Sequence, residues 1–114
     1  MLKKIECFLN PSRLDKVKDE LVKIGIDGMS VSEVKGFGRQ RGYLEGEKII
    51  NKAVKFLPKI KVEIVVDEEI VDKIIDFIKE LCAAKTIGAG KIFVLPVEDA
   101  VRIRTAEVGK SAIY

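Results

Sequence analysis

The chain of 114 residues is 47% hydrophobic and 34% charged, a composition typical of one folded domain and too apolar for a disordered chain. Its apolar stretches fall far short of the roughly 20 residues that cross a bilayer, and its charged start lacks a signal peptide's pattern, so we expect a cytoplasmic protein. The net charge of +3 is too small to indicate a nucleic-acid partner, and the absence of His removes the usual nucleophile pairs of hydrolases.

The first half of the chain predicts a strand, a helix and a second strand. Apolar and polar residues alternate over Lys3–Leu9, which is typical of a strand. Asn10 is the expected N-cap of the helix, and Pro11 suits its first position because proline lacks an N–H. Gly25 is expected to end this helix, and Met29–Lys35 has the pattern of the second strand. The helix would bury its residues at 3.6-residue spacing: Leu14, Val17, Leu21 and Ile24.

The second half repeats this order. Lys59–Val66 predicts a third strand, Asp67 is the expected cap of a second helix, and Lys91–Val97 predicts a fourth strand. Cys7 and Cys82 fall within apolar patterns, so we expect two reduced core thiols rather than a disulfide or metal site. The apolar stripe of the second helix consists of Val71, Ile74, Ile75, Ile78, Leu81 and Cys82.

An internal repeat supports this order of elements. Residues 5–19 align without gaps with residues 62–76, so one strand-helix-strand unit occurs twice in the chain. Two such units in tandem predict one α+β domain over residues 1–114 with the ferredoxin-like βαββαβ arrangement, in which two helices cover one face of a four-stranded sheet. This arrangement leaves the second face of the sheet bare.

The fourth strand indicates that the bare face is covered. Both of its faces are apolar, whereas a strand buried on one face alternates with polar residues. The chain has no segment left over for this purpose, so we expect copies of the chain to cover the face in a homo-oligomer. The two faces carry Ile92, Val94 and Pro96 on one side and Phe93, Leu95 and Val97 on the other.

Two segments outside the repeat carry candidate chemistry. The long connection over residues 36–58 is either a solvated loop or a loop that docks on a partner or orders around a ligand. The glycines of Gly88-Ala89-Gly90-Lys91 allow backbone N–H groups to approach an anion, and the lysine can neutralise phosphate. Arg102 and Arg104 would face the same way in an extended segment, which suits a polyanion; the alternative is a solvated basic strand edge.

Four blocks of sequence resemble the PII signal-transduction proteins of nitrogen metabolism over nearly the whole chain. The blocks are Gly28–Gln40, Phe56–Val66, Gly90–Val94 and Val101–Thr105, in the order and spacing of the family. The resemblance implies a homotrimer with inward-facing sheets and nucleotide sites between subunits. ATP and ADP would compete for each site, with 2-oxoglutarate binding beside Mg-ATP. The loop over residues 37–55 would bind an ammonium transporter, another membrane transporter or a regulatory enzyme. The protein would then be a cytoplasmic sensor and not an enzyme, and binding to a transporter would recruit it to the membrane.

The resemblance also implies roles for individual residues. The adenine and ribose pocket would be lined by Gly28, Met29, Ser30, Glu63 and Val65. The phosphates would be held by Gly88, Ala89, Gly90 and Lys91, with Arg102 and Arg104 from the neighbouring subunit. Gln40 would complete the magnesium coordination, Lys59 would pair with a 2-oxoglutarate carboxylate, and the backbone at Gly38 and Arg39 would meet its other end and the nucleotide.

The chain departs from the family pattern in both functional segments. Ala89 replaces the usual Asp of the phosphate loop, and Lys85 replaces a Gly. Lys52 stands where the family carries the Tyr that is uridylylated, so we expect no uridylylation there. The alternative function is therefore a trimeric regulator whose nucleotide or 2-oxoglutarate sensing is altered or lost, serving a different transporter or a metal-handling system.

Overall fold

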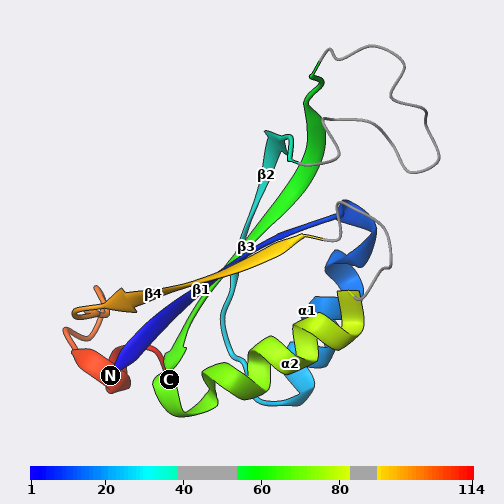
Figure 1. The fold of residues 1–114 in the computed structure, drawn as a ribbon. Helices are drawn as coiled ribbons and strands as arrows, with labels where there is room; N and C mark the ends of the chain where they lie inside the picture. Colours follow the sequence, from blue (N-terminus) through cyan, green and yellow to red (C-terminus); the bar gives the residue numbers. More distant parts are fainter. Residues whose placement is uncertain (39–53, 83–89) are drawn as a thin grey trace.

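The computed structural model describes residues 1–38, 54–82 and 90–114, which form a four-stranded antiparallel sheet with two helices on one face (Figure 1). The strand order is β2-β3-β1-β4, and every neighbouring pair is antiparallel. This order confirms the predicted ferredoxin-like arrangement. The elements are β1 (Leu2–Leu9), α1 (Leu14–Lys23), β2 (Ser30–Gly36), β3 (Leu57–Asp67), α2 (Val71–Cys82) and β4 (Lys91–Val97).

Both helices begin with a turn of 3₁₀ helix, Pro11–Arg13 before α1 and Glu68–Ile70 before α2. Asp67 caps its turn as predicted, since its Oδ1 accepts a hydrogen bond from the backbone N–H of Glu69 at 3.0 Å. Asn10 occupies the N-cap position before Pro11 as predicted, but its side chain makes no capping hydrogen bond.

A different donor occupies the Asn10 side chain. Its Oδ1 accepts a hydrogen bond from Lys59 Nζ at 3.1 Å, across from the first residues of β3. A charged ammonium is a stronger donor than a backbone N–H, which explains why the amide oxygen turns toward the sheet. At the other end of α1, Gly25 has a φ of +96° and ends the helix as predicted.

The core lies between the helices and the inward face of the sheet. In the central pair of strands, Ile5 lies opposite Ile64 and Cys7 opposite Val62, and all four side chains are buried. Cys7 and Cys82 are free and buried, as predicted, and burial raises the pKa of the Cys7 thiol to about 12. The helices contribute Val17, Leu21, Val71, Ile74, Ile78 and Cys82 to this core.

β4 is the edge strand with the most exposed apolar surface. Phe93, Val94 and Leu95 are 47%, 42% and 38% exposed, although successive residues point to opposite faces. We predicted a homo-oligomer because both faces of this strand are apolar, and the exposure of these side chains agrees with that argument. The homo-oligomer itself stays a prediction. Among the described residues, no helix has the length and apolar character to cross a membrane.

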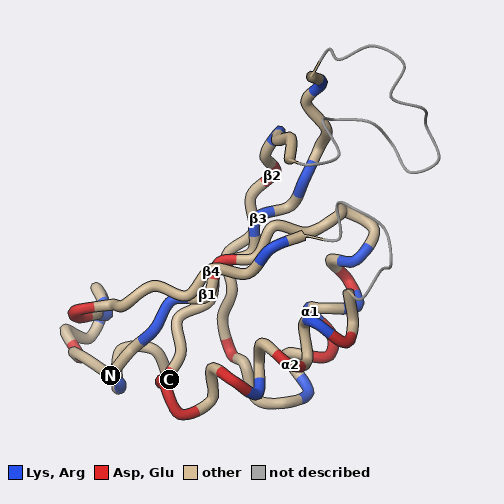
Figure 2. The backbone as a smooth tube through the Cα atoms, viewed as in Figure 1, with Lys and Arg blue, Asp and Glu red and all other residues tan. Residues whose placement is uncertain are grey.

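The two helices carry mixed charge. Basic and acidic residues are interleaved along both of them (Figure 2). Within the described part of the chain, the helical face therefore offers no single basic stripe to a polyanion.

Substitution of Asp67 tests the cap of α2. We expect Asp67→Ala to lower the free energy of unfolding by about 1 kcal/mol, because a backbone N–H at the helix start loses its acceptor. Asp67→Asn is the matched control, since it keeps an acceptor oxygen and loses only the charge that faces Lys110 Nζ at 3.3 Å. Urea denaturation of both variants measures the difference; equal destabilisation would show that the charge, not the cap, stabilises this end.

Candidate functional site

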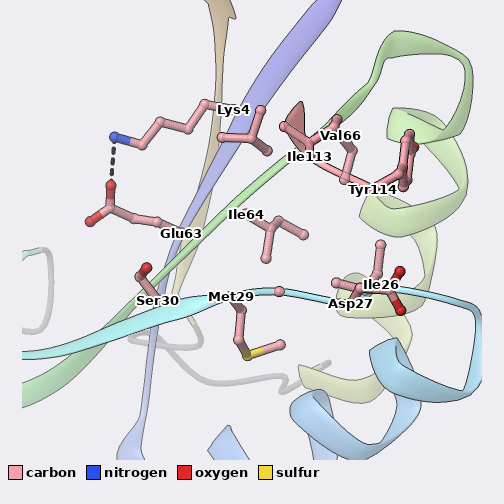
Figure 3. Close-up of a pocket in the computed structure, with 12 residues that line it drawn as sticks. Lys4, Ile26, Asp27, Met29, Ser30, Glu63, Ile64, Val66, Ile113 and Tyr114 are labelled. Carbon is pink, nitrogen blue, oxygen red and sulfur yellow. Dashed lines mark ion pairs between the residues drawn. The ribbon is translucent and has the colours of Figure 1, made fainter. Parts of the chain in front are cut away.

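A pocket of about 540 Å³ lies where the start of β2 meets the end of β3 (Figure 3). All five residues that the family resemblance assigns to a nucleoside pocket line it: Gly28, Met29, Ser30, Glu63 and Val65. The structure brings these residues together from segments more than 30 positions apart, and their role in binding a nucleoside stays a prediction.

The connection from α1 to β2 forms one wall because its apolar residues are anchored. Ile26 is buried, and Met29 packs against the core, so the exposed Asp27 and Gly28 between them lie at the pocket. Ser30 then begins β2 directly opposite Glu63 of β3. The strand register thus sets the position of the polar pair on this wall.

A square of four alternating charges lies on the open face of the sheet beside the pocket. Lys4 Nζ is 3.1 Å from Glu6 and 2.5 Å from Glu63, and Lys61 Nζ is 3.4 and 3.5 Å from the same two carboxylates. We call these four residues the charge square; Figure 3 shows its Lys4–Glu63 ion pair. Hydrogen bonds from Lys4 lower the pKa of Glu6 and Glu63, and the bond to Glu63 raises the pKa of Lys4.

The charge square determines what the pocket can accept. Lys4 is the cation among its lining residues, and two carboxylates already pair with it. Asp27 and Glu63 add negative charge to the lining. The pocket therefore suits a neutral group with polar edges, and a phosphate chain would need cations from elsewhere.

The predicted phosphate residues are only partly described. Gly88 and Ala89 lie outside the described residues. Gly90 has a φ of +116°, and a Cβ there would clash with the carbonyl oxygen of Phe8. Lys91 follows as the exposed first residue of β4, opposite Phe8. Glycine is thus required at position 90 both by its backbone conformation and by the close approach of β1.

The predicted extended segment at Arg102 and Arg104 is wrong. The backbone N–H of Ala106 donates to Arg102 O at 2.8 Å, and the N–H of Arg102 donates to Glu107 O at 2.8 Å. The chain therefore forms a tight turn here, and Ala106 adopts a φ of 60° to close it. Arg104 is exposed at the turn, whereas the guanidinium of Arg102 is held by neighbouring groups.

The arginines and Lys91 lie at opposite ends of β4 (Figure 1). The strand separates Lys91 from Val97 by about 20 Å, at ~3.3 Å per residue. Lys91 and Arg104 of one chain therefore do not reach the same phosphate group. A site that uses both residues needs two copies of the chain.

The predicted 2-oxoglutarate and magnesium residues lie around the long loop. Arg39, Gln40 and Lys52 lie outside the described residues, and Gly38 is exposed just before them. Lys59 donates to Asn10, a contact that it would have to leave to pair with a carboxylate. Within residues 1–38, 54–82 and 90–114, no group of three His, Cys, Asp or Glu side chains could hold a metal ion.

The two ends of this loop are held together by aromatic rings. Phe37 and Phe56 pack edge to face with ring centroids 5.5 Å apart, although both side chains are more than half exposed. The contact fixes the spacing of the two loop ends at the tip of β2 and β3.

Sequence reasoning missed several lining residues. Lys4, Ile26 and Asp27 line the pocket, as do Ile113 and Tyr114 from the end of the chain. The internal repeat carried a signal for the first of these, because Lys4 and Glu6 align with Lys61 and Glu63. No signal pointed to Ile113 and Tyr114, which lie beyond the repeat.

Comparison with known proteins gives a consistent picture. The family model described as "Nitrogen regulatory protein P-II" matches residues 2–107. Curated proteins of that name from Azospirillum brasilense and Nostoc punctiforme are 47% and 51% identical, each over 98% of this chain and 100% of the relative. A crystal structure of Arabidopsis thaliana PII bound to citrate superposes with a TM-score of 0.79 at 41% identity, covering 97% of this chain and 91% of that chain.

Alanine at position 90 tests the contact between Gly90 and Phe8. We expect Gly90→Ala to lower the free energy of unfolding by more than about 1 kcal/mol, because the backbone is left-handed and β1 must shift. Gly28→Ala is the control, since a Cβ there meets nothing within 4 Å. Thermal or urea denaturation compares the two; equal stability of both variants would contradict the close approach.

A pH series tests the charge square. The pKa of Glu6 is below its usual 4.5, so the ion pairs stabilise the fold at neutral pH and are lost as the pH falls through the lowered value. We expect the difference in Tm between the unmodified chain and Glu6→Gln to be largest near neutral pH. The difference should shrink as the pH falls below 4.5 and through the lowered pKa of Glu6, while Lys4 stays charged throughout. A difference that does not vary with pH would contradict this assignment.

Proposed function

This chain belongs to the nitrogen regulatory protein P-II family, and from that premise we propose that it is a homotrimeric sensor that binds ATP or ADP between its subunits. In this proposal, 2-oxoglutarate binds beside Mg-ATP. The ligands set the conformation of the loop over residues 37–55, which controls a membrane transporter or a regulatory enzyme.

The observation that carries the proposal is that the cations expected to bind phosphate lie at opposite ends of β4. The pocket brings together Gly28, Met29 and Ser30 with Glu63 and Val65, and it has the polar, weakly acidic lining that suits a nucleoside. The cations expected to bind phosphate do not line this pocket: Arg102 contacts Tyr114 at its edge, and Lys91 lies at the far end of β4. Only a neighbouring copy brings both sets to one nucleotide.

The exposed apolar residues of β4 support the assembly. Phe93 and Leu95 lie on the open face, where their register partners on β1 are Glu6 and Lys4 of the charge square. An apolar strip beside a fully paired charge cluster is a surface that another protein can cover without leaving a charge unpaired. Light scattering at micromolar concentration should give the mass of three chains.

The position of Lys59 supports a carboxylate ligand. Its hydrogen-bond acceptor is the neutral amide of Asn10, so this contact does not balance the ammonium charge. The solved relative from Arabidopsis thaliana is bound to citrate. A dicarboxylate such as 2-oxoglutarate presents the same anionic group to Lys59.

A second function is favoured by two departures from the family pattern. Ala89 removes a carboxylate from the phosphate segment, and Lys52 removes the modifiable tyrosine of the loop. These changes fit a trimeric regulator with altered sensing and a different target, such as another transporter or a metal-handling system. Calorimetric titration with ATP, ADP and Mg-ATP plus 2-oxoglutarate separates the two: no response to any nucleotide favours the second.

Complementation between subunits tests the shared nucleotide site. We expect Lys91→Ala and Arg104→Ala each to weaken ADP binding about tenfold or more while the trimer persists, because each removes a charged hydrogen-bond donor to phosphate. Lys16→Ala, on the exposed face of α1, should bind normally. Trimers reassembled from a mixture of the two deficient chains should regain tight binding at some sites. If the mixture binds no better than either parent, one chain provides both residues.

A further inference from the structure

The last residues of the chain lie between the pocket and Arg102. Ile113 and Tyr114 line the pocket (Figure 3). The main-chain oxygens of Ala112 and Tyr114 accept hydrogen bonds from Arg102 Nη2 at 3.4 and 2.5 Å. We call Ala112–Tyr114 the tail. It contacts both the nucleoside pocket of its chain and an arginine expected to bind phosphate.

The tail is tied down at its base. Lys110 pairs with Asp67 at 3.3 Å, and the backbone N–H of Gly109 donates to Ala100 O at 2.9 Å. Beyond this anchor, the N–H of Ile113 donates to Lys110 O at 3.3 Å, and the Tyr114 side chain is 49% exposed. The structure therefore fixes where the tail starts and leaves its end bound mainly through Arg102.

The guanidinium of Arg102 is occupied on both of its terminal nitrogens. Nη1 lies 3.4 Å from a carboxylate oxygen of Glu107, and Nη2 donates to the main-chain oxygens of Ala112 and Tyr114. An arginine binds phosphate most strongly through two parallel N–H groups. To present such a pair, Arg102 must give up its bonds to the tail.

We propose that the tail competes with phosphate for Arg102, so that a nucleotide binds this arginine only by displacing the main-chain oxygens of Ala112 and Tyr114. This inference rests on the proposed function, because Arg102 is the phosphate ligand there. A phosphate offers several charged oxygens to the guanidinium and can replace the tail oxygens there, whereas a nucleoside without phosphate has no group that can do so. The tail thereby weakens nucleotide binding selectively through its contact with the phosphate-binding side.

Removal of Ala112, Ile113 and Tyr114, which takes away both main-chain oxygens that Arg102 contacts, tests the competition. We expect the shortened chain to bind ADP roughly three- to tenfold more tightly than the full chain. In the shortened chain, Arg102 does not have to break its hydrogen bonds to the tail before it donates to phosphate. Adenosine should bind no more tightly than before, since only the pocket wall has changed. Tyr114→Ala is the matched control, as it loses the ring and keeps the main-chain oxygen. Calorimetry on all three chains gives the ratio of the adenosine and ADP dissociation constants.

The possible failures are distinguishable. If ADP binds both chains equally, or if ADP and adenosine change in parallel, the tail does not compete for Arg102. If ADP binds neither chain, the proposed function fails and this inference fails with it. Arg102→Ala in the shortened chain should abolish the gain; a gain that persists without Arg102 would also overturn the proposal.

A second measurement uses the full-length chain and does not depend on the folding of the shortened one. The sequence has two tyrosines, so Tyr43→Phe leaves Tyr114 as the single site for fluorotyrosine. We expect saturating ADP to narrow the fluorine resonance of Tyr114 as the tail is released, whereas adenosine, which occupies the pocket without releasing the tail, does not narrow it. An unchanged width at saturating ADP would overturn the proposal.

Discussion

The antiparallel pairing of β1 with β3 is the constraint on which the rest of this structure depends. Its register places Ile5 and Ile64 toward the helices and, one residue on, Glu6 and Glu63 side by side on the opposite face. Two carboxylates in direct register repel each other unless cations lie between them. The lysines of the charge square supply those cations, so a single register satisfies the core and the open face together.

The elements that could be predicted from sequence are those governed by periodicity. The alternation in β1 and β3 and the stripe of α2 predicted which residues are buried, and the bounds of β4 agreed with the structure. Predictions that depended on one side chain's choice of partner were less successful. Asn10 and Asp67 both occupy N-cap positions in the repeat, yet only the Asp67 side chain accepts a capping hydrogen bond, because Lys59 lies within reach of Asn10. The N-cap propensity of a residue depends on its local sequence, so it cannot predict a contact between residues 49 positions apart.

The pocket was predictable to the extent that the family resemblance named its residues. The resemblance does not predict which groups of the chain itself contact the pocket and Arg102 when no ligand is bound. The turn at Ala106 and the contacts of the tail depend on main-chain groups, which every residue carries and which leave no pattern in sequence. For that reason Arg102 appeared in the sequence as a free charge, whereas in the structure three oxygen atoms surround its guanidinium.

The end of β1 links two positions that have been treated separately. The carbonyl oxygen of Phe8 limits the space at Gly90, and two residues further on Asn10 holds Lys59. Three consecutive residues thus contact both the phosphate segment and the lysine proposed for a carboxylate ligand. If occupation of one position alters affinity at the other through this short path, thermodynamic linkage requires an equal effect in the reverse direction. The end of β1 would then couple the two positions, and its rigidity would set how strongly the two ligands of the proposed function affect each other's binding.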